Sequence, residues 1–78
     1  MRYQLDVTLR PAEGALTRVL GATERRGFRP ISLDGQARPD DGQWRLRMTV
    51  EGDRSDASLQ QQLAKMHDCL SVSVQPCP

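Results

Sequence analysis

Few residues in this 78-residue sequence have side chains suited to catalysis or to metal binding. The two cysteines, Cys69 and Cys77, lack the spacing of metal ligands, and no serine has an evident base beside it. The only histidine, His67, falls near the end of a predicted helix, where a cation complements the helix dipole. The neighbouring carboxylates Asp40 and Asp41 lie in turn-forming sequence, which favours a solvated hairpin tip. We therefore expect no catalytic residue, no metal site and no cofactor on this chain.

One loop has the backbone chemistry to hold a small anion. Gly14-Ala15-Leu16 opens a predicted helix, and a glycine there lets backbone N–H groups approach a carboxylate closely. An ordinary strand-to-helix turn accounts for the same residues, so the spacing alone leaves both interpretations open.

The pattern of apolar residues predicts the elements that hold this loop. Apolar residues at helical spacing predict one helix that starts near Ala15 and closes at Gly27, and a second that contains Leu59, Leu63 and Met66. Strict alternation of apolar and polar residues predicts strands with one polar face over 3–10, 44–51 and 70–75.

A fourth strand is predicted more weakly between the first helix and the turn at 38–42. Ile31 and Leu33 alternate with Ser32 and Asp34, but Pro30 restricts such a strand to a sheet edge or a bulge. The turn itself contains a proline and a glycine, so this strand and the next form a hairpin.

The order strand, helix, strand, strand, helix, strand predicts an α+β fold. Because the strands have one polar face, both helices should cover the same face of a four-stranded antiparallel sheet. Right-handed crossovers then favour a ferredoxin-like βαββαβ arrangement with the first and third strands central. A single domain should span 1–78, with its core over about 2–75 and a short loose tail at 76–78. The predicted open face carries Gln4, Asp6, Thr8, Arg45, Arg47, Thr49, Ser71 and Ser73.

Composition and missing residue types exclude several proteins of this fold. The loop before the first helix has no soft ligand for copper, and acylphosphatases require an asparagine, a residue absent from the sequence. RNA-recognition motifs stack bases on aromatic residues of the open face, where arginine and threonine are predicted here. A net charge of +1 is too small for the strongly basic surface that is typical of nucleic-acid-binding proteins. The basic open face nevertheless keeps RNA binding as a minor alternative.

Chain length and hydropathy predict the cellular location of the protein and its need for a partner. No apolar stretch approaches the roughly 20 residues of a membrane span, and the first residues do not open a signal peptide. We therefore expect a cytoplasmic protein with no membrane partner. A chain this short buries only about 60% of its unfolded surface, so its core is marginal and a partner or a second copy is expected.

The sequence from Gly14 to Leu33 resembles the opening of an ACT domain. In that family a G-x-L-x-R-V motif, a helix, an R-G-[FY] triplet and an I-x-S-L strand follow one another, as GALTRV, RGF and ISL do here. The resemblance is greatest to the small regulatory subunits of acetolactate (acetohydroxyacid) synthase, in the short type that consists of one ACT domain. The later strand at 48–50 and the helix at 59–66 match the same layout.

This resemblance implies a non-catalytic subunit that activates a large catalytic subunit of acetolactate synthase in branched-chain amino acid biosynthesis. The catalytic subunit of that enzyme uses thiamine diphosphate, Mg²⁺ and FAD, and the small subunit binds none of them. The resemblance also implies a homodimer formed through a sheet edge. The residues that match the family's amino-acid pocket are Gly14, Ala15, Leu16, Gly27, Phe28 and Ile31.

Two positions depart from the family members that respond to valine. Those members have an asparagine before the Gly-Ala-Leu motif and another after the R-G-[FY] triplet, where this sequence has Pro11 and Arg29. A site that hydrogen-bonds its ligand loses much of its affinity when those partners are missing. We therefore predict weak or absent feedback by valine.

Arginines are the predicted contacts to the partner enzyme. Arg10, Arg45 and Arg47 fall on or beside the predicted open face, and interfaces favour arginine over lysine. A second function remains open from the same resemblance: a stand-alone amino-acid sensor that regulates another enzyme or a transporter.

Overall fold

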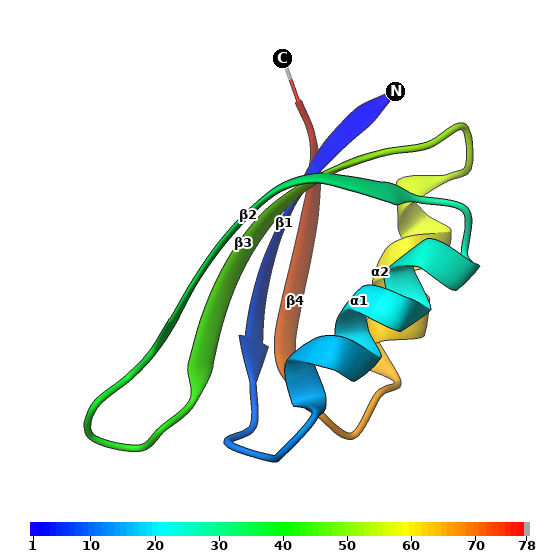
Figure 1. Cartoon of the computed structure of the whole chain (residues 1–78). Helices are drawn as coiled ribbons and strands as arrows, with labels where there is room; N and C mark the ends of the chain where they lie inside the picture. The colour runs from blue at the N-terminus through cyan, green and yellow to red at the C-terminus, as the bar shows by residue number, and fades with distance from the viewer. Residues whose placement is uncertain (78) are drawn as a thin grey trace.

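A computed structural model describes residues 1–77 and contains the six predicted elements in the predicted order. They are β1 (Arg2–Leu9), α1 (Ala15–Arg25), β2 (Arg29–Ala37), β3 (Trp44–Glu51), α2 (Asp56–Ala64) and β4 (Cys69–Pro76). The strands form one antiparallel sheet in the order β2-β3-β1-β4. Both helices lie on the same side of this sheet (Figure 1). The predicted α+β, ferredoxin-like fold with β1 and β3 central is confirmed.

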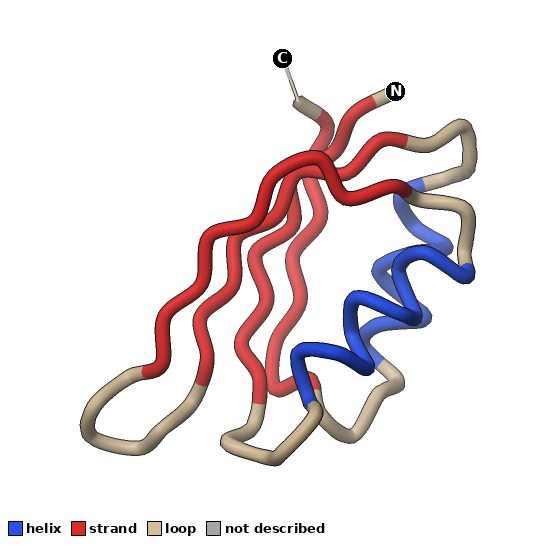
Figure 2. The backbone as a smooth tube through the Cα atoms, viewed as in Figure 1, coloured by secondary structure: helices blue, strands red, loops and turns tan. Residues whose placement is uncertain are grey.

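The core lies between the sheet and the two helices, as the one-sided strand patterns predict (Figure 2). Apart from the half-buried Trp44, alternate residues of the two central strands are at most 4% exposed, and they pack against the buried faces of α1 and α2. The buried apolar residues are Tyr3, Leu5, Val7, Leu9, Ala15, Val19, Phe28, Leu46, Met48, Val50, Leu59 and Leu63.

Local sequence explains where the helices begin and end. Gly27 has a φ of 88°, a left-handed conformation that closes α1 and turns the chain into β2. The side chain of Ser55 accepts a hydrogen bond of 3.2 Å from the N–H of Ala57 and so caps the start of α2. α2 ends at Ala64, and Met66 contacts the core from the turn that follows.

Each edge strand contains one bulge that the alternation does not reveal. The pairing register shifts at Ile31, between Pro30 and Ser32, and again at Leu70. A bulge adds one residue to a strand, so its side chain no longer follows the alternation of the neighbours. Ile31 is 42% and Leu70 39% exposed, and the predicted alternation is interrupted at both residues. The restriction that Pro30 places on β2 is confirmed, because β2 is an edge strand with a bulge beside this residue.

Leu33 is exposed for a different reason. It pairs with the buried Met48 and therefore lies on the helix-bearing face of the sheet. Leu33 is nevertheless 48% exposed, because the helix layer does not extend over β2. Every residue of β2 except the half-buried Pro30 is exposed. The strand thus leaves a backbone edge and apolar side chains uncovered.

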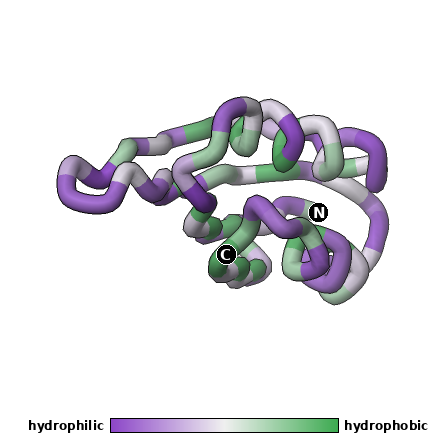
Figure 3. Tube along the Cα trace, turned by 90° about the horizontal axis from the view of Figure 1, so that it is seen from below, coloured by the Kyte–Doolittle hydropathy of each residue, from purple (hydrophilic) through white to green (hydrophobic). Residues whose placement is uncertain are grey.

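The hairpin between β2 and β3 ends in the predicted solvated turn. Gly42 has a φ of 73°, and the carboxylates of Asp40 and Asp41 accept hydrogen bonds from the backbone of the turn. Arg38 forms ion pairs with both carboxylates. The loop is hydrophilic where it projects at the left of Figure 3, so these carboxylates stabilise a turn and do not form an acid–base pair.

β4 extends further than the sequence predicts. Pro76 pairs with Tyr3, and the N–H of Cys77 donates a 2.9 Å hydrogen bond to the carbonyl of Arg2. The prediction of a loose tail is therefore wrong for Pro76 and Cys77, because the ladder to β1 continues through them. Pro78 lies outside the described residues.

Candidate functional site

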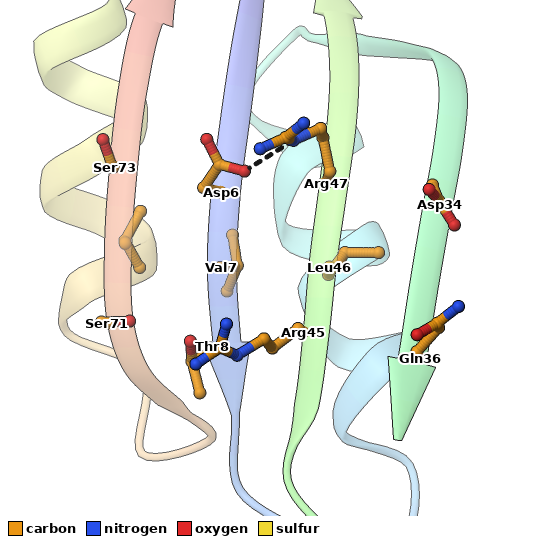
Figure 4. Close-up of a pocket in the computed structure, with 11 residues that line it drawn as sticks. Asp6, Val7, Thr8, Asp34, Gln36, Arg45, Leu46, Arg47, Ser71 and Ser73 are labelled. Carbon is orange, nitrogen blue, oxygen red and sulfur yellow. Dashed lines mark hydrogen bonds and ion pairs between the residues drawn. The ribbon is translucent and has the colours of Figure 1, made fainter. Parts of the chain in front are cut away.

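The open face of the sheet carries the polar side chains that the sequence predicts. The antiparallel register places Asp6 opposite Arg47 and Thr8 opposite Arg45. A groove of about 480 Å³ crosses this face, with walls from all four strands (Figure 4). The groove is lined by Asp6, Val7, Thr8, Asp34, Gln36, Arg45, Leu46, Arg47, Ser71, Val72 and Ser73.

Of the three arginines predicted as partner contacts, the structure places two in this groove. Arg47 is paired there with Asp6, with Nε 3.0 Å from the carboxylate, whereas Arg45 points across β1 toward Thr8 (Figure 4). Arg10 lies outside the groove, because its Nε donates a 2.7 Å hydrogen bond to the carbonyl of His67. Arg10 therefore holds the turn before β4 and is not brought together with the other two.

The six residues predicted to form an amino-acid pocket fall into two groups at opposite ends of α1. Gly14, Ala15 and Leu16 lie at its start, and Gly27 and Phe28 follow its end. An 11-residue helix is roughly 16 Å long, so these two groups do not meet within one chain. The sixth residue, on the bulge of β2, belongs to the second group.

The first group has a helix start without a side-chain cap. Gly14 has a φ of 79°, and a Cβ at this position would lie 2.8 Å from Nη1 of Arg18. Ala15 is buried, while Leu16 is partly exposed. The N–H of Ala15 donates a 3.2 Å hydrogen bond to the carbonyl of Ala12, so only the N–H groups that follow it in the first turn, which have no acceptor within the helix, are available to a ligand. This geometry is common to anion-binding turns and to ordinary strand-to-helix turns.

An ion pair fixes this helix start to the turn before β4. Nε and Nη2 of Arg18 donate hydrogen bonds of 2.7 and 2.8 Å to the two oxygens of Asp68, which is buried. The backbone N–H of Arg10 donates to the carbonyl of Asp68 at 2.8 Å. The hydrogen bond from Arg18, aided by its charge, holds the pKa of the Asp68 carboxyl below its ordinary value despite the opposing effect of burial.

The second group combines a buried anchor with an exposed edge. Phe28 is 1% exposed and packs edge to face against Tyr3, with ring centroids 6.0 Å apart. Ile31 lies on the bulge, exposed to solvent. Arg54 extends over Gly27, whose missing side chain leaves room for it.

The two positions that depart from the valine-responsive pattern have other contacts in this structure. Pro11 lies against Gly42 of the hairpin turn. Arg29 donates a 2.9 Å hydrogen bond to Glu51, and Arg2 binds the other oxygen of the same carboxylate at 3.2 Å. The hydrogen bond from Arg2, followed by that from Arg29, lowers the pKa of Glu51. Arg29 is thus part of an ion network at the end of the sheet.

The cysteines and the histidine do not assemble a reactive site. Burial, with a smaller effect of the Asp68 charge, raises the pKa of Cys69 to about 11, which disfavours the nucleophilic thiolate at neutral pH. Cys77 lies beyond the other end of β4, too far away to pair with Cys69 in one chain. Within residues 1–77, no three histidine, cysteine, aspartate or glutamate side chains are arranged to hold a metal ion.

The two helices described here are both too short and too polar to span a membrane.

Comparison with known proteins identifies the family. A sequence profile of the ACT domain matches residues 11–72, and the chain belongs to the ACT domain family. ACT domains are ligand-sensing regulatory domains and not catalytic ones.

Several solved structures share this fold at low sequence identity. The ACT domain from GTP pyrophosphokinase of Chlorobium tepidum aligns with a TM-score of 0.77 at 13% identity, over 95% of this chain and 96% of that one. The acetolactate synthase small subunit from Thermotoga maritima aligns with a TM-score of 0.76 at 24% identity; the match covers this whole chain and 50% of that one. Formyltetrahydrofolate deformylase from Burkholderia mallei aligns with a TM-score of 0.76 at 11% identity, over 97% of this chain and 28% of the enzyme.

Sequence reasoning missed ion pairs between residues that are far apart in the sequence. Arg18 and Asp68 are 50 residues apart, and Arg29 and Glu51 are 22 residues apart. Charge patterning along the chain detects pairs three or four residues apart on a helix, so it gave no signal for these contacts. The second pair follows once the register of β2 and β3 is known, because the two residues lie opposite each other.

Proposed function

We propose that this chain is a non-catalytic regulatory subunit that activates the large, catalytic subunit of acetolactate synthase. The family motifs at Gly14–Val19 and Gly27–Leu33 support this assignment, as does the fold shared with the small subunit from Thermotoga maritima. In this proposal the catalytic subunit binds thiamine diphosphate, Mg²⁺ and FAD, and this chain binds none of them.

The observation that supports the proposal is the position of the residues predicted to bind an amino acid. They are divided between the two ends of α1, and the second group adjoins the uncovered edge of β2. Gly14 and Leu16 lie at one end, Phe28 lies at the other, and Ile31 starts the exposed length of β2. A site that uses both groups therefore requires a second copy of the chain, as a regulatory dimer would provide.

Pairing of two β2 edges would supply that copy. A two-fold axis between antiparallel β2 strands reverses the direction of α1 in the second copy, so the start of one α1 faces the end of the other. Gly14 of one copy would then approach Gly27 and Ile31 of the other. The same pairing forms a continuous eight-stranded sheet and covers Leu33, one of the exposed apolar residues of the edge.

Valine is not the expected effector of this dimer. Pro11 offers neither an amide side chain nor a backbone N–H, and the guanidinium of Arg29 is bonded to Glu51. Calorimetric titration of the protein with valine should give no binding in the micromolar range. A micromolar affinity would contradict this part of the proposal.

Co-expression with an acetolactate synthase catalytic subunit tests the main proposal. The two chains should purify together, and acetolactate formation by the catalytic subunit should rise several-fold when this chain is added. A catalytic subunit from a different thiamine-diphosphate enzyme serves as the control and should not respond. Absence of both complex formation and activation would refute the proposal.

A stand-alone amino-acid sensor is the second candidate. The match to the ACT domain of a GTP pyrophosphokinase favours it, because the same fold occurs there in a different enzyme. A thermal-shift screen over the amino acids, without any catalytic subunit, distinguishes the two functions. A strong shift with one amino acid favours the sensor, whereas no shift together with activation of acetolactate synthase favours the subunit.

A further inference from the structure

Arg45 differs from every other arginine of the open sheet face. Arg2 and Arg29 share Glu51, and Arg47 is bonded to Asp6. Among residues 1–77, no carboxylate lies within ion-pair distance of Arg45, because its neighbours in the register are the uncharged Thr8 and Gln36. The face therefore presents one uncompensated guanidinium.

Hydroxyl groups lie near this guanidinium. The side chain of Arg45 extends from β3 over β1 and ends beside Thr8, and Ser71 stands opposite Thr8 on β4 (Figure 4). All three residues line the groove. A guanidinium with hydroxyl donors beside it matches a carboxylate, which accepts several hydrogen bonds at once.

The groove contains one further charge without an ion-pair partner, and this charge is negative. Asp34 lines the groove from β2, and no cation lies within 4.0 Å of its carboxylate among the described residues. The lining has two positive side chains, Arg45 and Arg47, and two negative ones, Asp6 and Asp34. Its net charge is zero, so it does not attract a polyanion. The carboxylate lies two strand spacings across the sheet and two residues along the strand from the guanidinium over β1, which separates the two charges by roughly 12 Å.

These charges point to a protein segment as the occupant. The ammonium and carboxylate of a free amino acid lie within one residue length, about 4 Å, and cannot reach both charges. Small-molecule sites also enclose most of their ligand, whereas this groove is open along the sheet. An extended segment of a large partner can place an acidic and a basic side chain about 12 Å apart on one face.

We propose that the groove docks an extended segment of the partner enzyme, with a carboxylate bound by Arg45 and Thr8 and a cationic side chain beside Asp34. The inference rests on the proposed regulatory function and adds to it the side chains that bind the enzyme. Arg47, already paired with Asp6, then contributes to the shape of the groove and is not a primary contact.

Affinity for the acetolactate synthase catalytic subunit provides the first test. Arg45→Glu should weaken binding at least 10-fold, and Asp34→Lys should weaken it several-fold. Arg25→Glu, the same charge change on the exposed end of α1, is the matched control and should change binding less than twofold. If the wild type binds and Arg45→Glu binds equally well, the docking inference is wrong and the regulatory function stands. Circular dichroism confirms that the variants are folded.

A peptide provides a test that does not depend on that enzyme. Acetyl-Glu-Ser-Ser-Ser-Lys-amide, whose charged side chains lie on one face about 13 Å apart when extended, should shift the amide resonances of Thr8, Arg45 and Ser71 at millimolar concentration. Arg45→Glu, or glutamine in place of the peptide's glutamate, should abolish these shifts. Shifts that persist in the variant, or their absence in the wild type, overturn the inference. It is also overturned if inorganic phosphate or a single-stranded oligonucleotide shifts the same resonances at lower concentration.

Discussion

β4 and β2 are both edge strands, and each has one bulge with an exposed apolar residue at it, but the helix layer packs more extensively against β4 than against β2. α2 packs against β4, and the turn before this strand is bonded to Arg10 and Arg18. β2 is exposed along almost its whole length. An uncovered edge with apolar side chains is a site for pairing with another strand. In the proposed dimer the two edges would therefore have separate roles, with β4 stabilising the monomer and β2 meeting a second copy.

The largest expected effect comes from the helix that covers β4. Leu59 of α2 is fully buried, and Leu59→Ala should lower the free energy of unfolding by about 2–5 kcal/mol. That is a large fraction of the total stability of a domain this small. Urea unfolding at a fixed protein concentration measures the change, and Leu70→Ala at the exposed bulge serves as the control with a much smaller loss. Equal losses in the two variants would show that α2 does not stabilise this edge.

Charge substitutions on the two edges test their separate roles directly. Leu33→Lys on β2 should weaken the dimer at least 100-fold, about 2.7 kcal/mol, because it brings like charges into the paired edge. Leu70→Lys changes a similarly exposed leucine on β4, 39% against 48%, and should leave the dimer intact. Sedimentation equilibrium over a concentration series measures both. If Leu70→Lys and not Leu33→Lys yields the monomer, the roles of the edges are reversed.

The sequence predicts the fold because its central strands have one apolar and one polar face. The alternation of Tyr3, Leu5 and Val7 with polar residues determines which face the helices cover, and Pro30 correctly assigns β2 to an edge. The exposure of Leu33 could not be predicted in this way. Alternation identifies the face on which a side chain lies, but not how far the helix layer extends over that face.

The candidate sites were predictable to a smaller extent. The alternation in β3 determines which side chains face away from the helices, so the position of Arg45 and Arg47 on the open face could be predicted, whereas their partners across the sheet could not. The bond between Arg10 and the carbonyl of His67 depends on how the turn before β4 folds back, which no local pattern encodes. The same holds for the pairing of Arg18 with Asp68.

The ion pair that attaches the β4 edge to α1 predicts a smaller, pH-dependent effect. The pKa of Asp68 is lowered in the folded protein from its ordinary value of 3.8, mainly by the hydrogen bond from Arg18. The unfolded chain therefore binds more protons near this pH, and the pair contributes stability above it. That contribution is lost as the pH falls below 3.8 and through the lower folded pKa. Asp68→Asn should thus be less stable than the wild type at pH 7, with a difference that narrows on acidification.

Urea unfolding of the wild type and Asp68→Asn at pH 7 and at about pH 2.5 tests this prediction, the lower value lying below the ordinary aspartate pKa. Glu51, whose pKa is also lowered, remains in both proteins, so its effect cancels in the difference. Asp53→Asn is the matched control, because Asp53 is exposed and has no ion-pair partner among the described residues. A difference that stays constant between the two pH values would mean that Asp68 acts through packing rather than through its charge. The attachment of β4 to α1 would then not depend on the ion pair, and the contrast with β2 would rest on the packing of α2 alone.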